Sequence, residues 1–288
     1  MSTADPGALG VLLAELIDDA ALFPPGDAPL ARAVPAHLAH DAGPLSGLLG
    51  RFLCPVSKLP DLKPLLAADE DLRLGLIADT GLDGLLAAFH AIDGDDRLIL
   101  ETAEIRHPGD RLDLLEEQLP YGVEAYIEIA PADMRSLLPA LTGRELLHAK
   151  LRTGGPKTEA FPTPLAVAEF LAGCADLEVG VKCTAGLHHA VRHADPETGF
   201  AYHGFLNVLL AAARASDGAD IAEVQDVLAV SDAEAIAESI KDLTVEDAAR
   251  TRDLFHCFGS CSFQEPVDDL KALGLLPGPQ GASGPPSV

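Results

Sequence analysis

The chain carries little positive charge and has no long apolar segment. Its 288 residues include 20 lysines and arginines against 45 aspartates and glutamates, which gives a formal net charge of −25. A surface this acidic repels nucleic acids and anionic membranes, so neither is expected as a partner. No apolar run approaches the roughly 18 residues of a membrane-spanning helix, so no membrane span is expected either.

Cysteine is scarce and odd in number, which argues against a disulfide framework. The five cysteines are Cys54, Cys174, Cys183, Cys257 and Cys261. The first residues also lack the basic region, apolar core and cleavage site of a signal peptide. These absences together predict reduced thiols in a cytoplasmic protein.

Short apolar segments alternate with helical patterns along most of the chain. The predicted strands cover 20–23, 50–54, 72–78, 97–102, 123–129 and 253–258, with two more that end at Lys150 and Lys182. Short apolar strands without strict alternation are typical of parallel strands covered by helices. The pattern predicts one (β/α)8 TIM-type barrel over residues 1–276, since such barrels span about 250 residues. An open doubly wound sheet is the alternative, but no Gly-x-Gly-x-x-Gly follows the first strand.

The last residues differ from the rest in composition. Residues 277–288 are rich in proline, glycine and serine. Segments of this kind cannot bury enough apolar surface to offset the entropy of ordering, so a disordered tail is predicted there.

Two strand-like segments concentrate the chemistry of the chain. Residues 146–155 read LLHAKLRTGG and residues 177–186 read LEVGVKCTAG, and each reaches a lysine before it breaks at small residues. Lys150 and Lys182 lie 32 residues apart, which leaves room for one βαβ unit between them. Both lysines are therefore expected to face one site at the carboxyl ends of adjacent strands. A desolvated lysine beside a second cation releases its proton readily and can attack a carbonyl.

Other polar residues are predicted to end strands around the same site. Glu101 and Glu128 are expected to move protons for the two lysines. The residues expected to bind the substrate are Arg152, Thr184, His256 and Ser260. A structural network, in which the glutamates pair with the lysines, is the alternative explanation of these charges.

The two lysine segments resemble class I aldolases of the deoxyribose-phosphate aldolase type. Residues 150–154, KLRTG, are similar to the lysine and Thr-Ser-Thr-Gly of that family's strand six. Residues 181–186, VKCTAG, are similar to the second lysine and small residues of its strand seven. The resemblance implies that Lys150 forms a Schiff base and that Lys182 eases its deprotonation.

A third segment, 98–102, is also similar to that family, although here the predicted strand 123–129 separates it from Lys150. Residues 16–25, LIDDAALFPP, look like the start of an uncharacterised family of bacterial barrel proteins, which implies no function. The sequence thus predicts a lyase of aldolase type that acts on a small carbonyl compound without a cofactor. The oligomeric state stays open, a homo-oligomer included.

Two further functions stay open as alternatives. Asp79, Glu101 and Glu128 are predicted at the ends of three successive strands, and three carboxylates suit Mg²⁺. This resembles the enolase superfamily, which abstracts a proton next to a carboxylate, but the chain has no separate capping domain. The other alternative is a non-catalytic barrel in which Arg152 holds an anion or a sugar.

Histidine and cysteine gather in the last hundred residues. The group comprises His188, His189, His193, His203, His256, Cys257 and Cys261. No Cys-x-x-Cys or His-Glu-x-x-His pattern accompanies it, so buried thiols and surface histidines are preferred to a metal site. Residues 188–207 are expected to form either a lid over the site or a structural excursion.

Overall fold

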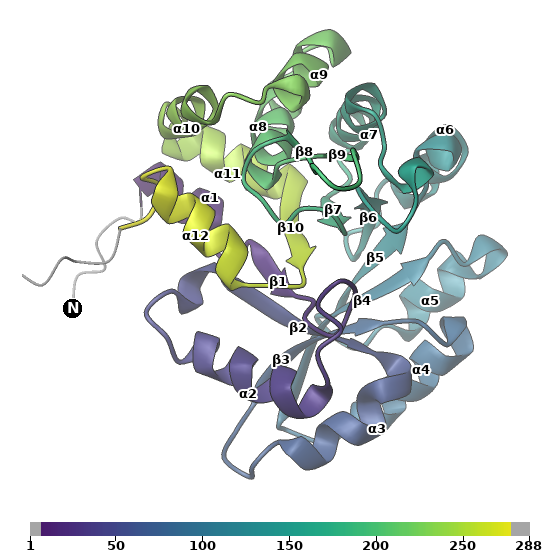
Figure 1. The fold of residues 1–288 in the computed structure, drawn as a ribbon. Coiled ribbons are helices and arrows are strands. Elements are labelled where there is room, and N and C mark those ends of the chain that lie inside the picture. The colour runs from purple at the N-terminus through teal and green to yellow at the C-terminus, as the bar shows by residue number, and fades with distance from the viewer. Residues whose placement is uncertain (1–6, 278–288) are drawn as a thin grey trace, which may run out of the picture.

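Eight parallel strands close into a barrel in the computed structural model, which describes residues 7–277 (Figure 1). They are β1 (Ile17–Asp19), β2 (Leu49–Pro55), β3 (Leu72–Ile77), β4 (Leu98–Arg106), β5 (Glu124–Glu128), β6 (Leu147–Arg152), β7 (Val181–Thr184) and β10 (Phe255–Ser260). Neighbours in the chain are neighbours in the barrel, and β10 closes it between β7 and β1. The predicted TIM-type barrel is confirmed.

The helices surround the barrel in Figure 1, with α2 to α5 on one side and α7 to α12 on the other. They are α1 (Gly7–Leu13), α2 (Leu30–Asp41), α3 (Leu59–Leu62), α4 (Gly81–Ile92), α5 (Leu112–Gln118), α6 (Met134–Leu137), α7 (Pro164–Asp176), α8 (Phe205–Ser216), α9 (Ile221–Ala229), α10 (Ala233–Lys241), α11 (Val245–Leu254) and α12 (Gln264–Ala272). No helix of the described range has the length and apolar character needed to cross a membrane.

The barrel strands are buried on both faces, because side chains fill the interior and helices cover the outside. Adjacent strands hold a register that sets the site. In this register Lys150 on β6 stands opposite Lys182 on β7, and Glu128 on β5 stands opposite Lys150. Three charged residues thus lie side by side, near the carboxyl ends of three neighbouring strands.

Between β7 and α8 the chain leaves the barrel for an antiparallel hairpin of two short strands. These are β8 (His193–Ala194) and β9 (Ala201–Tyr202). Sequence analysis left residues 188–207 open between a lid and an excursion, and it did not predict these strands. The predicted tail at 277–288 lies, apart from Pro277, outside the described residues.

Several strands differ from their predicted bounds, and two of these differences bring new residues into the site. The first helix ends at Leu13, and Glu15 takes a positive φ of 48°, which a helix cannot accommodate. The first strand is therefore Ile17–Asp19 rather than 20–23. The fourth strand extends four residues beyond its predicted end, to Arg106. These differences bring Asp18 and Glu104 into the barrel.

Candidate active site

A cavity of about 670 Å³ opens at the carboxyl ends of the barrel strands. Glu104 and Lys150 contribute to its lining, together with Arg152 at the end of β6 and Thr184 at the end of β7. This is the end of a (β/α)8 barrel at which enzymes of this fold carry their active sites.

One edge of the cavity is built from glycine. A Cβ atom added to Gly154 would lie 2.9 Å from the Cα of Gly186, so the loops after β6 and β7 meet backbone to backbone. The hydroxyl of Thr153 donates to the carbonyl of Ala185 over 2.5 Å and joins the same two loops. Gly186 also adopts a positive φ of 81°, which a residue with a side chain rarely does.

Lys182 lies below the cavity and is completely buried. Its ammonium group pairs with the carboxylate of Asp18 and lies 2.5 Å from Oε1 of Glu104. Asp18 is fixed in turn by the backbone amide of Arg51, at 2.7 Å, and by the thiol of Cys257, at 3.3 Å. Burial alone would lower the pKa of Lys182, but Asp18 and the other acidic neighbours outweigh it and raise the pKa above its ordinary value.

Lys150 lies above Lys182 and reaches the cavity. Its ammonium group is 2.6 Å from Oε2 of Glu104 and 3.1 Å from Oε2 of Glu128. Arg152 approaches the other oxygen of Glu128, at 3.6 Å. Three carboxylates and three cations therefore alternate from the interior of the barrel to its mouth, with Arg51 4.0 Å from Asp18 and Arg106 3.8 Å from Glu128 as outer cations.

Glu104 is the centre of this series, since each of its oxygens meets a different lysine. Its burial would raise the pKa of the carboxyl group, but the ammonium groups of Lys150 and Lys182 overcome burial and lower the pKa of Glu104 to about 2. Glu104 is therefore an anion at neutral pH, although it is 1% exposed.

The structure brings most of the predicted site residues together. Lys150, Lys182 and Glu128 belong to the charge series, and Arg152 and Thr184 line the cavity. Sequence analysis missed Asp18 and Glu104. Glu104 could have been predicted, because it lies two residues after Thr102 and so on the same face of β4. The predicted strand, however, ended at Thr102.

Glu101 lies away from this series, which corrects its predicted position at the end of a strand. It stands fourth in a strand of nine residues, and its carboxylate pairs with Arg51 and Arg73, each at 2.7 Å. Asp79 follows β3 and accepts hydrogen bonds from Ser57. The carboxylates of Asp79, Glu101 and Glu128 thus have separate partners, and their positions do not favour the magnesium alternative.

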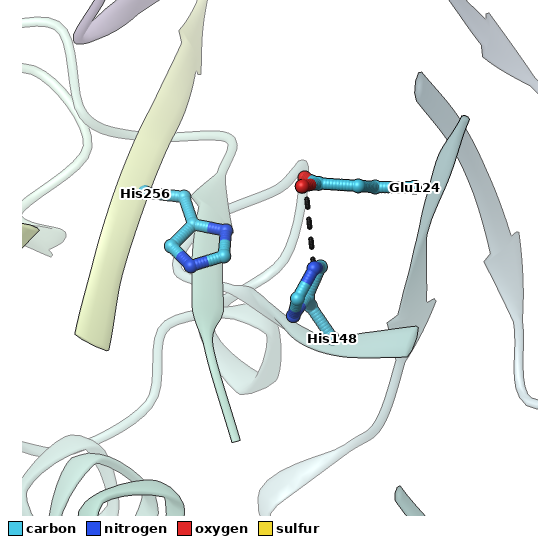
Figure 2. Close-up of side chains that lie close together, drawn as sticks. All are labelled: Glu124, His148 and His256. Atoms are coloured by element: carbon cyan, nitrogen blue, oxygen red, sulfur yellow. Dashed lines mark ion pairs between the residues drawn. The ribbon is translucent and has the colours of Figure 1, made fainter. Parts of the chain in front are cut away.

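Two residues expected to bind substrate lie elsewhere. Ser260 is 1% exposed and donates to the carbonyl of Ser262 at 2.7 Å, so its hydroxyl is already engaged. His256 lies near the start of β10, at the opposite end of the barrel, and groups with Glu124 and His148 (Figure 2). It was placed wrongly because the predicted strand ended at residue 258 instead of 260.

The group at this opposite end has shifted proton affinities. The neighbouring imidazole of His148, whose Nε2 lies 3.5 Å from the carboxylate, overcomes partial burial and lowers the pKa of Glu124 to about 2. Burial, followed by the neighbouring imidazole of His148, lowers the pKa of His256 to about 4. At neutral pH Glu124 is therefore charged, while His256 is neutral.

The mouth of the cavity carries a further group of histidines. Nδ1 of His188 is 3.5 Å from the thiol of Cys261 and 3.7 Å from the carboxylate of Glu265. Both partners approach the same ring nitrogen, so this is not the relay of a catalytic triad, which uses both nitrogens. Burial raises the pKa of Cys261, so the thiol stays protonated.

Comparison of the chain with family models, with curated proteins and with solved structures found no match.

Proposed function

We propose that the chain is a lyase of aldolase type, which binds a small carbonyl compound at the barrel mouth and forms a Schiff base with Lys150. One observation carries this proposal. Lys150 is the lysine that lines the cavity in the described part of the chain, and two carboxylates that can accept its proton hold its ammonium group. A lysine that served packing alone would not need to face a cavity of this size.

The nucleophile forms within the site. In the resting state Glu104 and Glu128 hold Lys150 as an ammonium ion. When a substrate displaces water, the surroundings become less polar and favour a neutral pair over an ion pair. The proton then passes to Glu104 over 2.6 Å, and the free amine attacks the carbonyl carbon.

The same carboxyl groups serve the later steps. A protonated glutamate gives its proton to the hydroxyl of the adduct, which leaves as water and produces the Schiff base. The positively charged imine accepts the electron pair of the breaking carbon–carbon bond, while Glu128 or Glu104 takes the proton from the hydroxyl group that becomes the second carbonyl. Proton return to carbon and hydrolysis then release the first product and restore Lys150.

Lys182 acts in this scheme as a positioning residue. It is 0% exposed and does not reach the cavity, but it lies 2.5 Å from Glu104. In the resting site its charge, fixed by Asp18, keeps Glu104 ionised, so that Glu104 can accept a proton, and oriented toward Lys150. This role differs from the one that the aldolase resemblance implies, in which Lys182 acts directly on the proton affinity of Lys150.

The charge balance restricts the substrate. The carboxylates of Asp18, Glu104 and Glu128 are each paired, so the deep part of the site has no surplus cation for a highly charged ligand. Arg152, whose side chain is 46% exposed, and Thr184 can hold one anionic or hydroxyl group at the rim. A small hydroxy-aldehyde, hydroxy-ketone or keto acid fits these features.

Borohydride trapping tests the proposal. Full-length protein treated with sodium borohydride and a panel of small aldehydes and keto acids should gain one reduced adduct, located at Lys150 by peptide mass spectrometry. Lys150→Ala should abolish the adduct, whereas the exposed Lys241→Ala should trap like the wild type. An adduct at Lys182, or a substrate that is turned over without any adduct, would contradict the proposal.

A further inference from the structure

Three side chains converge at the end of the barrel opposite the cavity. Glu124 begins β5, while His148 and His256 each stand second in β6 and β10. One possible ligand atom from each residue lies within 4.8 Å of the other two. Within residues 7–277, no other group of histidine, cysteine, aspartate or glutamate meets this condition. Figure 2 shows the carboxylate and the two imidazoles turned toward one another.

The spacing suits a bound ion. Oε2 of Glu124 and Nε2 of His148 are 3.5 Å apart. Bonds of about 2.1 Å at tetrahedral angles place two ligand atoms about 3.4 Å apart, so an ion between them would need little movement. Nε2 of His148 is buried and has no hydrogen-bond partner, which leaves a nitrogen lone pair or proton unsatisfied in the interior.

Gly180 provides the room for the two rings. A Cβ atom at this position would lie 2.4 Å from Nε2 of His256 and 2.9 Å from Nδ1 of His148. Gly180 directly precedes β7, the strand between β6 and β10, so the chain omits a side chain where both imidazoles turn inward.

The surrounding groups are polar and include the guanidinium groups of two arginines. The hydroxyl of Tyr126 lies 2.9 Å from Nδ1 of His256 and 3.4 Å from Oε2 of Glu124. Arg51 and Arg252 act on the group as nearby cations, which opposes a positive ion. Arg51 is itself paired with Glu101 at 2.7 Å, so part of its charge is neutralised.

We propose that Glu124, His148 and His256 bind a divalent ion of the zinc class, through one oxygen and two imidazole nitrogens, with water as the fourth ligand. Two nitrogen ligands disfavour Mg²⁺ and Ca²⁺, which prefer oxygen alone. The ion would join β5 and β6 to β10 across the barrel, at the end where this fold carries stability rather than catalysis. It is therefore a structural site, independent of the Schiff base.

Zinc binding to the metal-stripped full-length protein tests this site. Titration calorimetry should give one ion per chain, and zinc at 100 times its Kd should raise Tm by about 5 °C. Glu124→Gln and His148→Gln should each weaken binding at least about 100-fold, since even the loss of an outer partner of a ligand costs 10–100-fold. A matched control combines His188→Gln, His189→Gln and His193→Gln at the cavity mouth and should bind zinc like the wild type.

Circular dichroism of each metal-free variant separates loss of the ligand from loss of the fold. Cobalt in place of zinc should give the visible spectrum of nitrogen and oxygen ligands. Wild-type protein that takes up no stoichiometric zinc would overturn the proposal. So would binding that persists in a folded His148→Gln variant, or a thiolate charge-transfer band with cobalt. Borohydride trapping at Lys150 should be unchanged in His148→Gln, so the zinc site and the Schiff base are tested independently of each other.

Discussion

The two ends of the barrel use the same strands for opposite chemistry. On β6, His148 faces the amino end and Lys150 the carboxyl end, and the two stand only two residues apart, about 7 Å along the strand. At the carboxyl end, ammonium groups and carboxylates neutralise one another in series. At the amino end, two imidazoles meet a single carboxylate, with the guanidinium groups of Arg51 and Arg252 nearby. One end is therefore suited to proton transfer, and the other to holding a cation.

Tyr126 separates these two chemistries. Its ring lies 5.4 Å from Nζ of Lys182 on one side, while its hydroxyl bonds to His256 on the other. Burial raises the pKa of Tyr126 well above its ordinary value, so the phenol stays neutral between the two groups. A neutral aromatic side chain therefore lies between the charges of the two ends.

The largest effect is expected from Lys182→Leu. The substitution leaves Asp18 and Glu104 buried without their shared cation, and loss of one partner of a buried ion pair typically costs about 3–5 kcal/mol of unfolding free energy. Urea denaturation measures this loss. The double variant Asp18→Asn with Lys182→Leu should recover part of it. A single variant within about 1 kcal/mol of the wild type would show that the charge series is not a structural unit.

Glu104→Gln should slow reductive trapping at Lys150 about 1,000-fold, because general acid–base groups commonly contribute 10²–10⁴ in rate. Glu101→Gln is the matched control, since it changes the same residue type on the same strand toward the other end. That control should trap at the wild-type rate. Equal slowing by both substitutions would remove the distinction between the two ends of β4.

The pH dependence of stability should reveal the contribution of the same carboxylate, Glu104. The pKa of Glu104 is lowered in the fold, from its ordinary value of 4.5 to about 2. Its contribution to stability is therefore complete above about pH 4.5 and is lost as the pH falls toward 2. The loss corresponds to about 3 kcal/mol. Unfolding free energies measured from pH 5 to 2 should fall less steeply in Glu104→Gln than in the wild type, and parallel curves would contradict the assignment.

The smallest effect in this series is expected from Gly180→Ala. The added methyl would meet both imidazoles and should lower zinc affinity about 10-fold, a shift that an altered partner of a ligand typically produces. Trapping at Lys150 should stay within twofold of the wild type, because the methyl lies at the other end. Gly173→Ala, where the methyl would meet only the side chains of Leu138 and Met134, is a neutral control.

The barrel and part of its site could be predicted from sequence, because strand–helix alternation is a local signal. Lys150 and Lys182 lie on adjacent strands as predicted, since each follows an apolar run before small residues, but Lys182 lies below the cavity instead of facing it. Asp18 and Glu104 were missed because a charged residue in the sequence normally indicates an exposed position after the end of a strand. Only the partners of these carboxylates explain why they are buried. Those partners lie 164 residues away for Asp18 and on two other strands for Glu104.

The amino-end group was hidden for a related reason. The predicted strand ended at Lys150, which left His148 near its carboxyl end, and His256 was counted with the substrate-binding residues. In both cases the predicted strand ended two residues too early. In a strand of only six residues, this shift places a residue of the amino end near the carboxyl end. Glu124 drew no attention, because a lone acid at the start of a strand has no partner in the local sequence. The lyase activity itself stays a prediction.

The contact between Gly154 and Gly186 determines which part of the entrance can move. Because the loops after β6 and β7 touch through their backbones and share the hydrogen bond from Thr153, that side of the rim behaves as one rigid edge. Any widening of the entrance is therefore expected from other segments that border the cavity, among them Pro24, Pro25 and the β8–β9 hairpin. Slow ligand exchange would then be governed by this hairpin, and amide hydrogen exchange should register a bound substrate there before it does so at the glycine edge.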